Sequence, residues 1–186
     1  MSLQIRQRPL PYSTALTQRD LGDVDLAVIH CTELPELSDA RTMGEKIRYA
    51  GSGTGNSGHF YIDRNGQVEN WVPVERVAHH VRGFNERSIG IELVNRGRYP
   101  HWWHADHQQM TEHYTVEQMA SLSVLLQDLA QNLPTLSWVT GHEDLDQEQI
   151  PAEDDPGRLV SRKTDPGPLF PWSDLLVQTS LKRLSS

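Results

Sequence analysis

Two short apolar runs, each ending in a histidine, constrain the fold of this chain more than any other feature. Residues 25–30 read Asp-Leu-Ala-Val-Ile-His, and residues 138–142 read Trp-Val-Thr-Gly-His. Their length and content predict short strands. Ligands gather at the carboxyl ends of strands in open α/β sheets, which gives His30 and His142 functional positions. A single strand-end histidine is more often structural, so each needs partners before a site is inferred.

A third run, residues 88–94, alternates with the period of two that is typical of a strand. One face of this strand carries only apolar side chains, those of Ile89, Ile91 and Leu93. Glu92 lies on the other face beside Gly90, which leaves open space. Because a buried glutamate is rare unless it is paired or functional, Glu92 is a candidate catalytic residue. The alternative is an edge-strand glutamate that faces water.

The turn at residues 161–168 places a lysine and an aspartate two positions apart, just before Pro-Gly-Pro. Proline fixes φ and restricts the residue before it, so this turn is rigid. In an extended segment residues i and i+2 project to the same side, so Lys163 and Asp165 can point into one cavity. His30, His142 and Asp165 together can bind a metal ion, with Lys163 close by. The alternative is a solvated basic turn.

The rest of the chain predicts one domain over residues 1–186, with a polar N-terminal arm at 1–20 and the core at 21–186. Asn65-Gly66 between two strand-like runs is a strong hairpin signal. Regular elements are also expected elsewhere: a weak helix over 35–50, a capped core helix from Thr115 to Leu133, and a final helix over 170–184. The glycine-rich residues 51–58 lack the ending of a phosphate-binding loop and are interpreted as a flexible rim.

Residues 78–85 form a polar and aromatic loop that we expect to contact substrate. His79 and His80 are adjacent, and adjacent residues seldom point at one metal ion. We therefore favour a substrate contact for His80 over a third histidine ligand. Arg82 and Asn85, on the same loop, are assigned to substrate binding as well.

Two further loops carry residues that suggest function. Residues 95–114 hold two tryptophans and four histidines, but the irregular histidine spacing favours a surface insertion near the cleft over a metal site. Residues 143–158 are acidic and contain two prolines, which predicts an exposed loop. Two roles remain possible for this loop: it can act as a lid, or it can change the substrate preference.

Composition excludes several classes of protein. A net charge of -8 with scattered Lys and Arg argues against nucleic-acid binding. No apolar run approaches the roughly 18 residues needed to span a bilayer, so we expect no membrane contact. Cys31 is the only cysteine, which excludes an internal disulfide, and we interpret it as a buried filler. No signal peptide is visible at the N-terminus, although a chain trimmed of its signal would look the same.

His30, His142 and Asp165 match the catalytic zinc arrangement of three protein ligands and one open position. Zinc lowers the pKa of water in that position toward about 7. Amide hydrolysis also needs a carboxylate that takes the water proton and passes it to the leaving amine, which suits Glu92. A cation that stabilises the oxyanion is the last requirement, which suits Lys163.

Four segments resemble the zinc-dependent N-acetylmuramoyl-L-alanine amidases of the amidase-2 family. They are residues 28–31, 59–66 and 88–93, and Gly141-His142 with residues 162–168. The resemblance implies one zinc ion on His30, His142 and Asp165, and catalytic roles for Glu92 and Lys163. It also implies an α/β fold, with a mixed central β-sheet flanked by α-helices, and a substrate cleft lined by the loop that holds His80.

The chain departs from the family pattern at three places. Where many members have Ala-Trp-His-Ala-Gly, this chain has residues 78–83, so one wall of the cleft differs. A tyrosine that some members carry before the position of His59 is replaced by Gly58, so catalytic help from that tyrosine is absent. The acidic segment 144–156 is longer than expected and leaves the exact substrate open.

The resulting hypothesis is a monomeric zinc amidase that cleaves the bond between the muramic-acid lactyl group and L-alanine in peptidoglycan or its fragments. Cytoplasmic recycling of anhydromuropeptides is favoured over action on intact wall; a periplasmic location follows if a signal was removed. The alternatives are a non-catalytic peptidoglycan-binding module, a zinc peptidase acting on the stem peptide, and a structural metal site.

Overall fold

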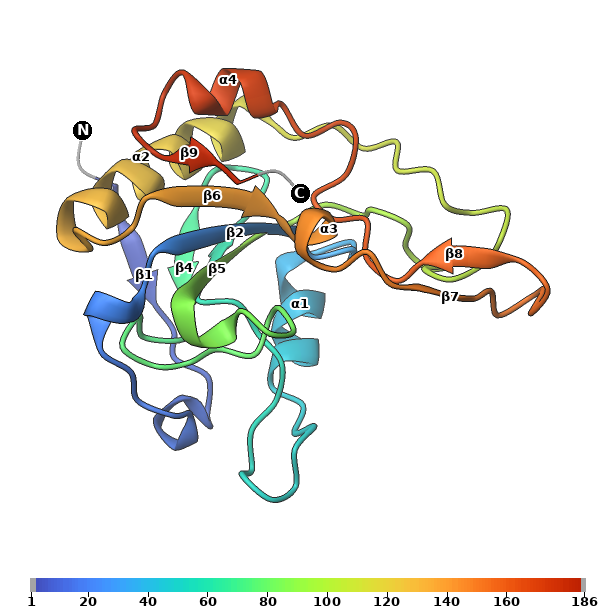
Figure 1. Ribbon diagram of the computed structural model, residues 1–186, viewed down its shortest axis with the longest axis horizontal. Helices are drawn as coiled ribbons and strands as arrows, with labels where there is room; N and C mark the ends of the chain where they lie inside the picture. The colour runs from blue at the N-terminus through green and yellow to red at the C-terminus, as the bar shows by residue number, and fades with distance from the viewer. Residues whose placement is uncertain (1–2, 185–186) are drawn as a thin grey trace.

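The computed structural model describes residues 3–184, and a seven-stranded sheet forms its centre (Figure 1). Its strands are β1 (Ile5–Gln7), β2 (Leu26–Cys31), β3 (Phe60–Ile62), β4 (Val68–Asn70), β5 (Ser88–Leu93), β6 (Trp138–Gly141) and β9 (Lys182–Arg183). They lie in the order β1-β4-β3-β5-β2-β6-β9. Strands β3 and β4 pair antiparallel, and the other neighbouring pairs are parallel. The predicted mixed central sheet is confirmed.

Two helices, α2 (Val116–Asn132) and α4 (Trp172–Leu176), cover one face of the sheet. The predicted capping box is present: the Gln118 N–H donates to the Thr115 hydroxyl at 3.0 Å, and the Thr115 N–H donates to the Gln118 side chain at 3.1 Å. The leucines of α2 meet the inward side chains of β2, β3, β5 and β6 in the main core. Burial of these apolar side chains is the main stabilising contribution to the fold.

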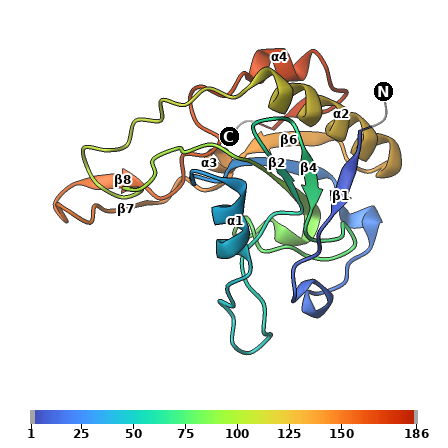
Figure 2. The ribbon, with the colours of Figure 1, turned by 180° about the vertical axis from the view of Figure 1, so that it is seen from behind.

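The opposite face of the sheet carries helix α1 (Leu37–Gly44) and the N-terminal segment (Figure 2). The N-terminal segment, which was expected to be a surface arm, contributes a strand to the sheet and side chains to the core. Strand β1 extends the sheet beside β4, and Leu10, Tyr12 and Leu16 are buried against Tyr61 and other residues of a second core cluster. The described part of residues 1–20 is therefore integral to the domain, because its apolar side chains close this face.

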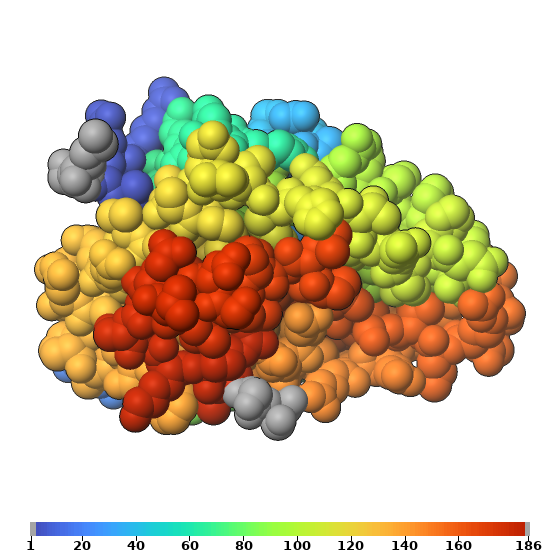
Figure 3. Space-filling model, turned by 90° about the horizontal axis from the view of Figure 1, so that it is seen from above, coloured from blue at the N-terminus to red at the C-terminus, as the bar shows by residue number. Residues whose placement is uncertain are grey.

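The hairpin predicted at Asn65-Gly66 joins β3 to β4, and Gly66 has the positive φ of 80° that such a turn requires. The predicted final helix is only partly correct. Helix α4 ends at Leu176, and the chain then turns to add the edge strand β9 beside β6. In Figure 3 this C-terminal segment, in red, packs against the gold part of the chain that includes α2.

Residues 143–158 are not the simple exposed loop that their composition predicted. They begin in the short helix α3 (His142–Leu145) and continue into a hairpin of β7 (Gln149–Pro151) and β8 (Leu159–Ser161). This hairpin and the loop 95–114 form a protrusion at one end of the molecule (Figures 1 and 3). The two segments share a small cluster of apolar side chains, those of Ala105, Ile150, Ala152 and Val160.

Short 3₁₀ turns complete the described structure, at Ser13–Ala15, Leu21–Asp23 and Asn85–Arg87. Among residues 3–184, no helix combines the length and the apolar character needed to cross a bilayer.

Candidate active site

Three neighbouring strands bring the first site residues together on the α1 side of the sheet. In the parallel register His30 of β2 lies beside Glu92 of β5, and Glu92 lies beside Tyr61 of β3. Because side chains alternate along a strand, Glu92 and Gly90 face this side while the isoleucines of β5 enter the main core. Strand β5 lies between β2 and β3, so the alternative of an edge-strand glutamate is wrong.

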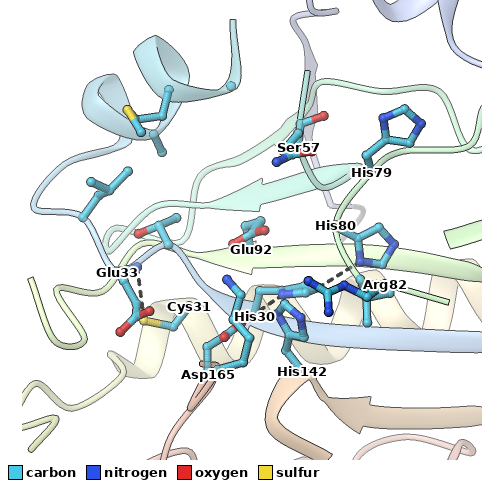
Figure 4. Close-up of a pocket in the computed structure, with 18 of the residues that line it drawn as sticks. His30, Cys31, Glu33, Ser57, His79, His80, Arg82, Glu92, His142 and Asp165 are labelled. Atoms are coloured by element: carbon cyan, nitrogen blue, oxygen red, sulfur yellow. Dashed lines mark hydrogen bonds and ion pairs between the residues drawn. The ribbon is translucent and has the colours of Figure 1, made fainter. Parts of the chain in front are cut away.

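His142 and Asp165 join His30 from two other segments (Figure 4). His142 begins α3 directly after β6, and Asp165 follows β8 in the rigid turn. The Asp165 carbonyl accepts a 2.9 Å hydrogen bond from the Glu143 N–H, which fastens this turn to α3. His30 Nδ1 lies 2.9 Å and His142 Nδ1 lies 3.1 Å from Asp165 Oδ2.

The chemistry of this group fits a zinc ion. One atom from each of His30, His142 and Asp165 lies within 4.8 Å of the other two, and all three residues are buried. Ligand atoms about 2.1 Å from one tetrahedral zinc ion lie about 3.4 Å apart, which is close to the distances found here. In addition, Asp165 Oδ1 is buried and has no hydrogen-bond partner within residues 3–184. A buried carboxylate oxygen without a donor is costly unless a cation binds there.

Electrostatics distinguish the two carboxylates. Burial, with a further contribution from Asp165, raises the pKa of Glu92 to about 8 against the opposing effect of Lys163. Burial alone would also raise the pKa of Asp165, but His142, His30 and Lys163 hold it well below the usual range. The neighbours of Asp165 thus favour its ionised form, whereas Glu92 can exchange a proton near neutral pH.

All eight site residues predicted from the sequence line one cavity of about 720 Å³. His30, His142 and Asp165 form the group that could hold a metal ion, and Glu92 and Lys163 line the same cavity. The remaining three, His80, Arg82 and Asn85, lie on the loop that forms another part of the wall. Cys31 is buried, in line with its interpretation as a filler, and it does not belong to the metal group.

The loop residues differ in what their side chains contact. The Asn85 side-chain oxygen accepts hydrogen bonds from the N–H groups of His80 and Val81, at 3.0 and 2.8 Å, so it shapes the loop from within. Arg82 is largely exposed and donates to Glu148 at 2.8 Å, across the rim of the cavity. Arg82 is exposed enough to meet a ligand at the rim besides its contact with Glu148, whereas the Asn85 oxygen already accepts two hydrogen bonds.

His80 lies in the interior of the site. Its Nδ1 is 2.9 Å from His30 Nε2, and its Nε2 is 3.2 Å from the Ser88 hydroxyl. Space for the ring exists because residue 90 is glycine: a Cβ there would lie 2.6 Å from His80 Cγ. A Cβ at Gly58 would likewise lie 2.9 Å from Glu92 Cγ, so the absence of a tyrosine at that position makes room for Glu92.

Sequence reasoning missed the buried ion pair between Glu33 and Arg98. Two nitrogens of Arg98 donate to the Glu33 carboxylate at 2.7 and 2.9 Å, and a third donates to the Ser161 carbonyl at 2.9 Å. Glu33 also has a positive φ of 49°, an uncommon conformation outside glycine. The pair ties the end of β2 to the loop 95–114 and to the start of the turn that holds Lys163. Both residues line the cavity, as do Tyr61, Trp102, Trp103 and Arg162.

A second histidine-rich group lies in the protrusion. The backbone N–H of each of these histidines donates to the carbonyl three residues earlier, which forms successive turns. These turns bring the rings of His101, His104 and His107 together, with ring centroids 4.4 to 5.9 Å apart. The spacing is thus regular in the fold, contrary to the interpretation from the sequence. His104 also lies near Asp106 and Asp154.

The carboxylates of this second group already have protein partners. Asp154 accepts from the Ala105 N–H at 2.7 Å, and Asp106 accepts from Arg158 at 2.7 Å. These contacts join the loop 95–114 to the hairpin of β7 and β8. We therefore assign the group to the structure of the protrusion.

Comparisons with known proteins agree with this architecture. The family model for N-acetylmuramoyl-L-alanine amidase matches residues 20–168. The 1,6-anhydro-N-acetylmuramyl-L-alanine amidase AmpD of Enterobacter cloacae is 31% identical over 121 residues, which cover 60% of this chain and 51% of that protein. The chain thus spans about half the length of this curated relative.

Solved structures show the same fold. A selenomethionine derivative of AmpD matches with a TM-score of 0.67 at 25% identity, over 96% of this chain and 99% of that one. AmpDh3 from Pseudomonas aeruginosa, in complex with an anhydromuramic pentapeptide, matches with a TM-score of 0.63 at 25% identity, over 84% of this chain and 60% of that one.

Proposed function

We propose that this chain, which belongs to the N-acetylmuramoyl-L-alanine amidase family, is a zinc-dependent amidase. The bond cleaved is the amide between N-acetylmuramoyl, or 1,6-anhydro-N-acetylmuramoyl, and L-alanine. One observation carries the proposal: the buried group of His30, His142 and Asp165 lines the same cavity as Glu92 and Lys163.

In this proposal His30 and His142 hold one zinc ion through Nδ1, and Asp165 holds it through a carboxylate oxygen. When bound, zinc supplies Lewis-acid activation of water and of the scissile carbonyl. The chain's contribution is to present these ligands in a fixed arrangement. Burial, the sheet and the turn at Asp165 leave them little freedom to move.

Glu92 is the proton carrier of the proposed reaction. Its carboxylate accepts a proton from the attacking water and delivers it to the nitrogen of the leaving L-alanine. A group that must both take and give a proton works best when its pKa lies near the working pH. The raised pKa of Glu92, about 8, meets that condition, and its cause is burial beside Asp165.

Lys163 stabilises the negative charge that develops on the carbonyl oxygen. It is half-buried, lines the cavity and lies two residues from Asp165 on the rigid turn. An ammonium group held in a partly dry site is worth more to an oxyanion than the same group in water.

The size and lining of the cavity support a muropeptide as substrate. A volume of about 720 Å³ accommodates a ligand larger than a dipeptide, and the lining combines tryptophans with several arginines. The names of the relatives specify the 1,6-anhydro sugar, which supports anhydromuropeptides as the substrate of this chain. We further propose a cytoplasmic role in the recycling of these fragments. We propose that the protein acts as a monomer, without nucleic-acid or membrane partners.

Mass spectrometry of the products tests this proposal. The purified protein is incubated with an anhydromuropeptide and, separately, with intact sacculi, with and without a chelator. We expect free stem peptide that begins with L-alanine, lost on chelation and regained with zinc. Cleavage inside the stem peptide would identify a peptidase instead. Intact substrate with zinc bound would identify a binding module.

A further inference from the structure

A chain of hydrogen bonds runs from the loop backbone to His30. The Ser88 hydroxyl lies 2.7 Å from the Phe84 carbonyl oxygen and 3.2 Å from His80 Nε2. His80 Nδ1 lies 2.9 Å from His30 Nε2, and His30 Nδ1 lies 2.9 Å from Asp165 Oδ2. Figure 4 shows His80 on the side of His30 that is away from Asp165.

The direction of each hydrogen bond follows from its fixed end. A carbonyl oxygen only accepts, so the Ser88 hydroxyl donates its single hydrogen bond to the Phe84 carbonyl. The Ser88 oxygen must then accept a hydrogen bond from the N–H at His80 Nε2. A neutral imidazole has one N–H, so His80 Nδ1 is an acceptor, and it accepts a hydrogen bond from the N–H at His30 Nε2.

The consequence appears at the other side of the His30 ring. With its proton on Nε2, His30 presents a bare lone pair at Nδ1, only 2.9 Å from an oxygen of the Asp165 carboxylate. Two acceptors at this distance repel each other unless a cation or a proton lies between them. The hydrogen bonds of the loop therefore prepare Nδ1 as a metal ligand.

We infer that His80 is a positioning residue for the metal site: held by Ser88, it fixes the proton of His30 on Nε2 and keeps Nδ1 free for zinc. This role of His80 deepens the proposed function and rests on it, because it requires His30 to be a zinc ligand. It also replaces the substrate contact that the sequence suggested for His80. Outer partners of this kind typically change metal affinity or activity by roughly 10–100-fold.

Neighbouring residues hold His80 in the position that this role requires. The Asn85 side chain holds the backbone of His80 and Val81, and Gly90 provides the space in which the His80 ring lies. His142, in contrast, has no such support, because its Nε2 is buried without a partner among residues 3–184. The two histidine ligands thus differ, and His30 is the one whose tautomer is set by the chain.

Nitrogen-15 NMR of the unmodified protein gives the first test, because long-range spectra distinguish the tautomers of histidine. We expect the proton of His80 on Nε2 in the metal-free and in the zinc-loaded protein. A proton on Nδ1 of His80 would overturn the inference. This measurement needs no substrate and no variant that has to fold.

Zinc affinity, measured by competition with a chromophoric chelator, gives the second test. His80→Leu removes the acceptor, and we expect roughly 10–100-fold weaker zinc binding. His80→Asn keeps an acceptor oxygen near the position of Nδ1, so its affinity should return to within about threefold of wild type, by the same scale. Ser88→Ala removes only the outer partner and should weaken binding less than His80→Leu. Equal affinities in all four proteins would overturn the inference.

Kinetics of the zinc-saturated variants separate positioning from substrate contact. A positioning residue leaves KM for the muropeptide nearly unchanged in His80→Leu, whereas a substrate contact raises KM and leaves zinc affinity intact. The second pattern would overturn the inference while the amidase proposal stands. Conversely, an inactive wild-type protein with the expected tautomer and zinc affinities would contradict only the amidase proposal.

Discussion

The buried group of His30, His142 and Asp165 and the exposed group of His104, Asp106 and Asp154 both bring imidazoles and carboxylates within reach of one ion. In the buried group a carboxylate oxygen and an imidazole nitrogen lack hydrogen-bond partners within the described chain. In the exposed group both carboxylates accept from the backbone or from arginine. Closeness of ligand atoms alone therefore does not identify a site. A buried carboxylate oxygen without a donor, that of Asp165, distinguishes the candidate metal site.

The largest effect in this comparison is expected from removing one aspartate of each group. Asp165→Asn should reduce amidase activity to background and weaken zinc binding by more than the roughly 10–100-fold that loss of an outer partner costs. Asp154→Asn should change neither, since its contacts hold the protrusion. Chelator competition and turnover of an anhydromuropeptide check both variants, and equal zinc loss in the two would erase the distinction between the groups.

Glu92→Gln sharpens the comparison, because only the buried group has a proton carrier beside it. The variant keeps the size of the side chain but cannot accept the water proton. We expect zinc to remain bound and kcat to fall by about 10²–10⁴-fold, the usual contribution of a general acid–base. Steady-state kinetics with metal analysis of the same sample measure this. Full activity of the variant would show that another group carries the proton.

Lys163→Met should give the next largest effect. Methionine is an unbranched side chain close in length to lysine but has no charge, so stabilisation of the oxyanion is lost. A fall in kcat of about 10²–10³-fold is expected, with zinc retained. If KM rises instead and kcat is unchanged, Lys163 binds substrate and has no role in the chemical step.

Gly90→Ala tests whether the buried group depends on packing as well as on its ligands. The added Cβ would lie 2.6 Å from the His80 ring, so the ring must shift. Overpacking of this kind costs about 1–3 kcal/mol of unfolding free energy. Gly51→Ala is the matched control, because a Cβ there has no neighbour within 4 Å. Denaturant unfolding of both should show the difference, and equal stabilities would mean that His80 has room to move.

Much of the site was predictable because strand ends and rigid turns leave local signals. His30, His142, Glu92 and Asp165 each lie where a short apolar run or a proline fixes the backbone. The Glu33–Arg98 ion pair left no such signal, since its partners are 65 residues apart and only the fold brings them together. The hairpin of β7 and β8 was missed because its strands have only three residues each and the segment that joins them is acidic.

His80 shows a different limit of the sequence. The polar loop that holds His80 was expected to line the cavity, and it does. The contact of His80 with His30, however, could not be deduced from the sequence. The contact with His30 depends on the register of β2 against β5 and on the space above Gly90, and both are tertiary properties. The contacts among the rings of His101, His104 and His107 were likewise not predictable, because they arise from successive turns and not from a helix or strand.

The zinc content of three proteins tests the central claim most directly. Native mass spectrometry after dialysis would compare the wild type with two variants, His30→Ala/His142→Ala in the buried group and His101→Ala/His104→Ala/His107→Ala in the protrusion. Our account predicts one zinc ion per chain in the wild type, none in the first variant and one in the second. Zinc retained by the first variant and lost from the second would contradict it.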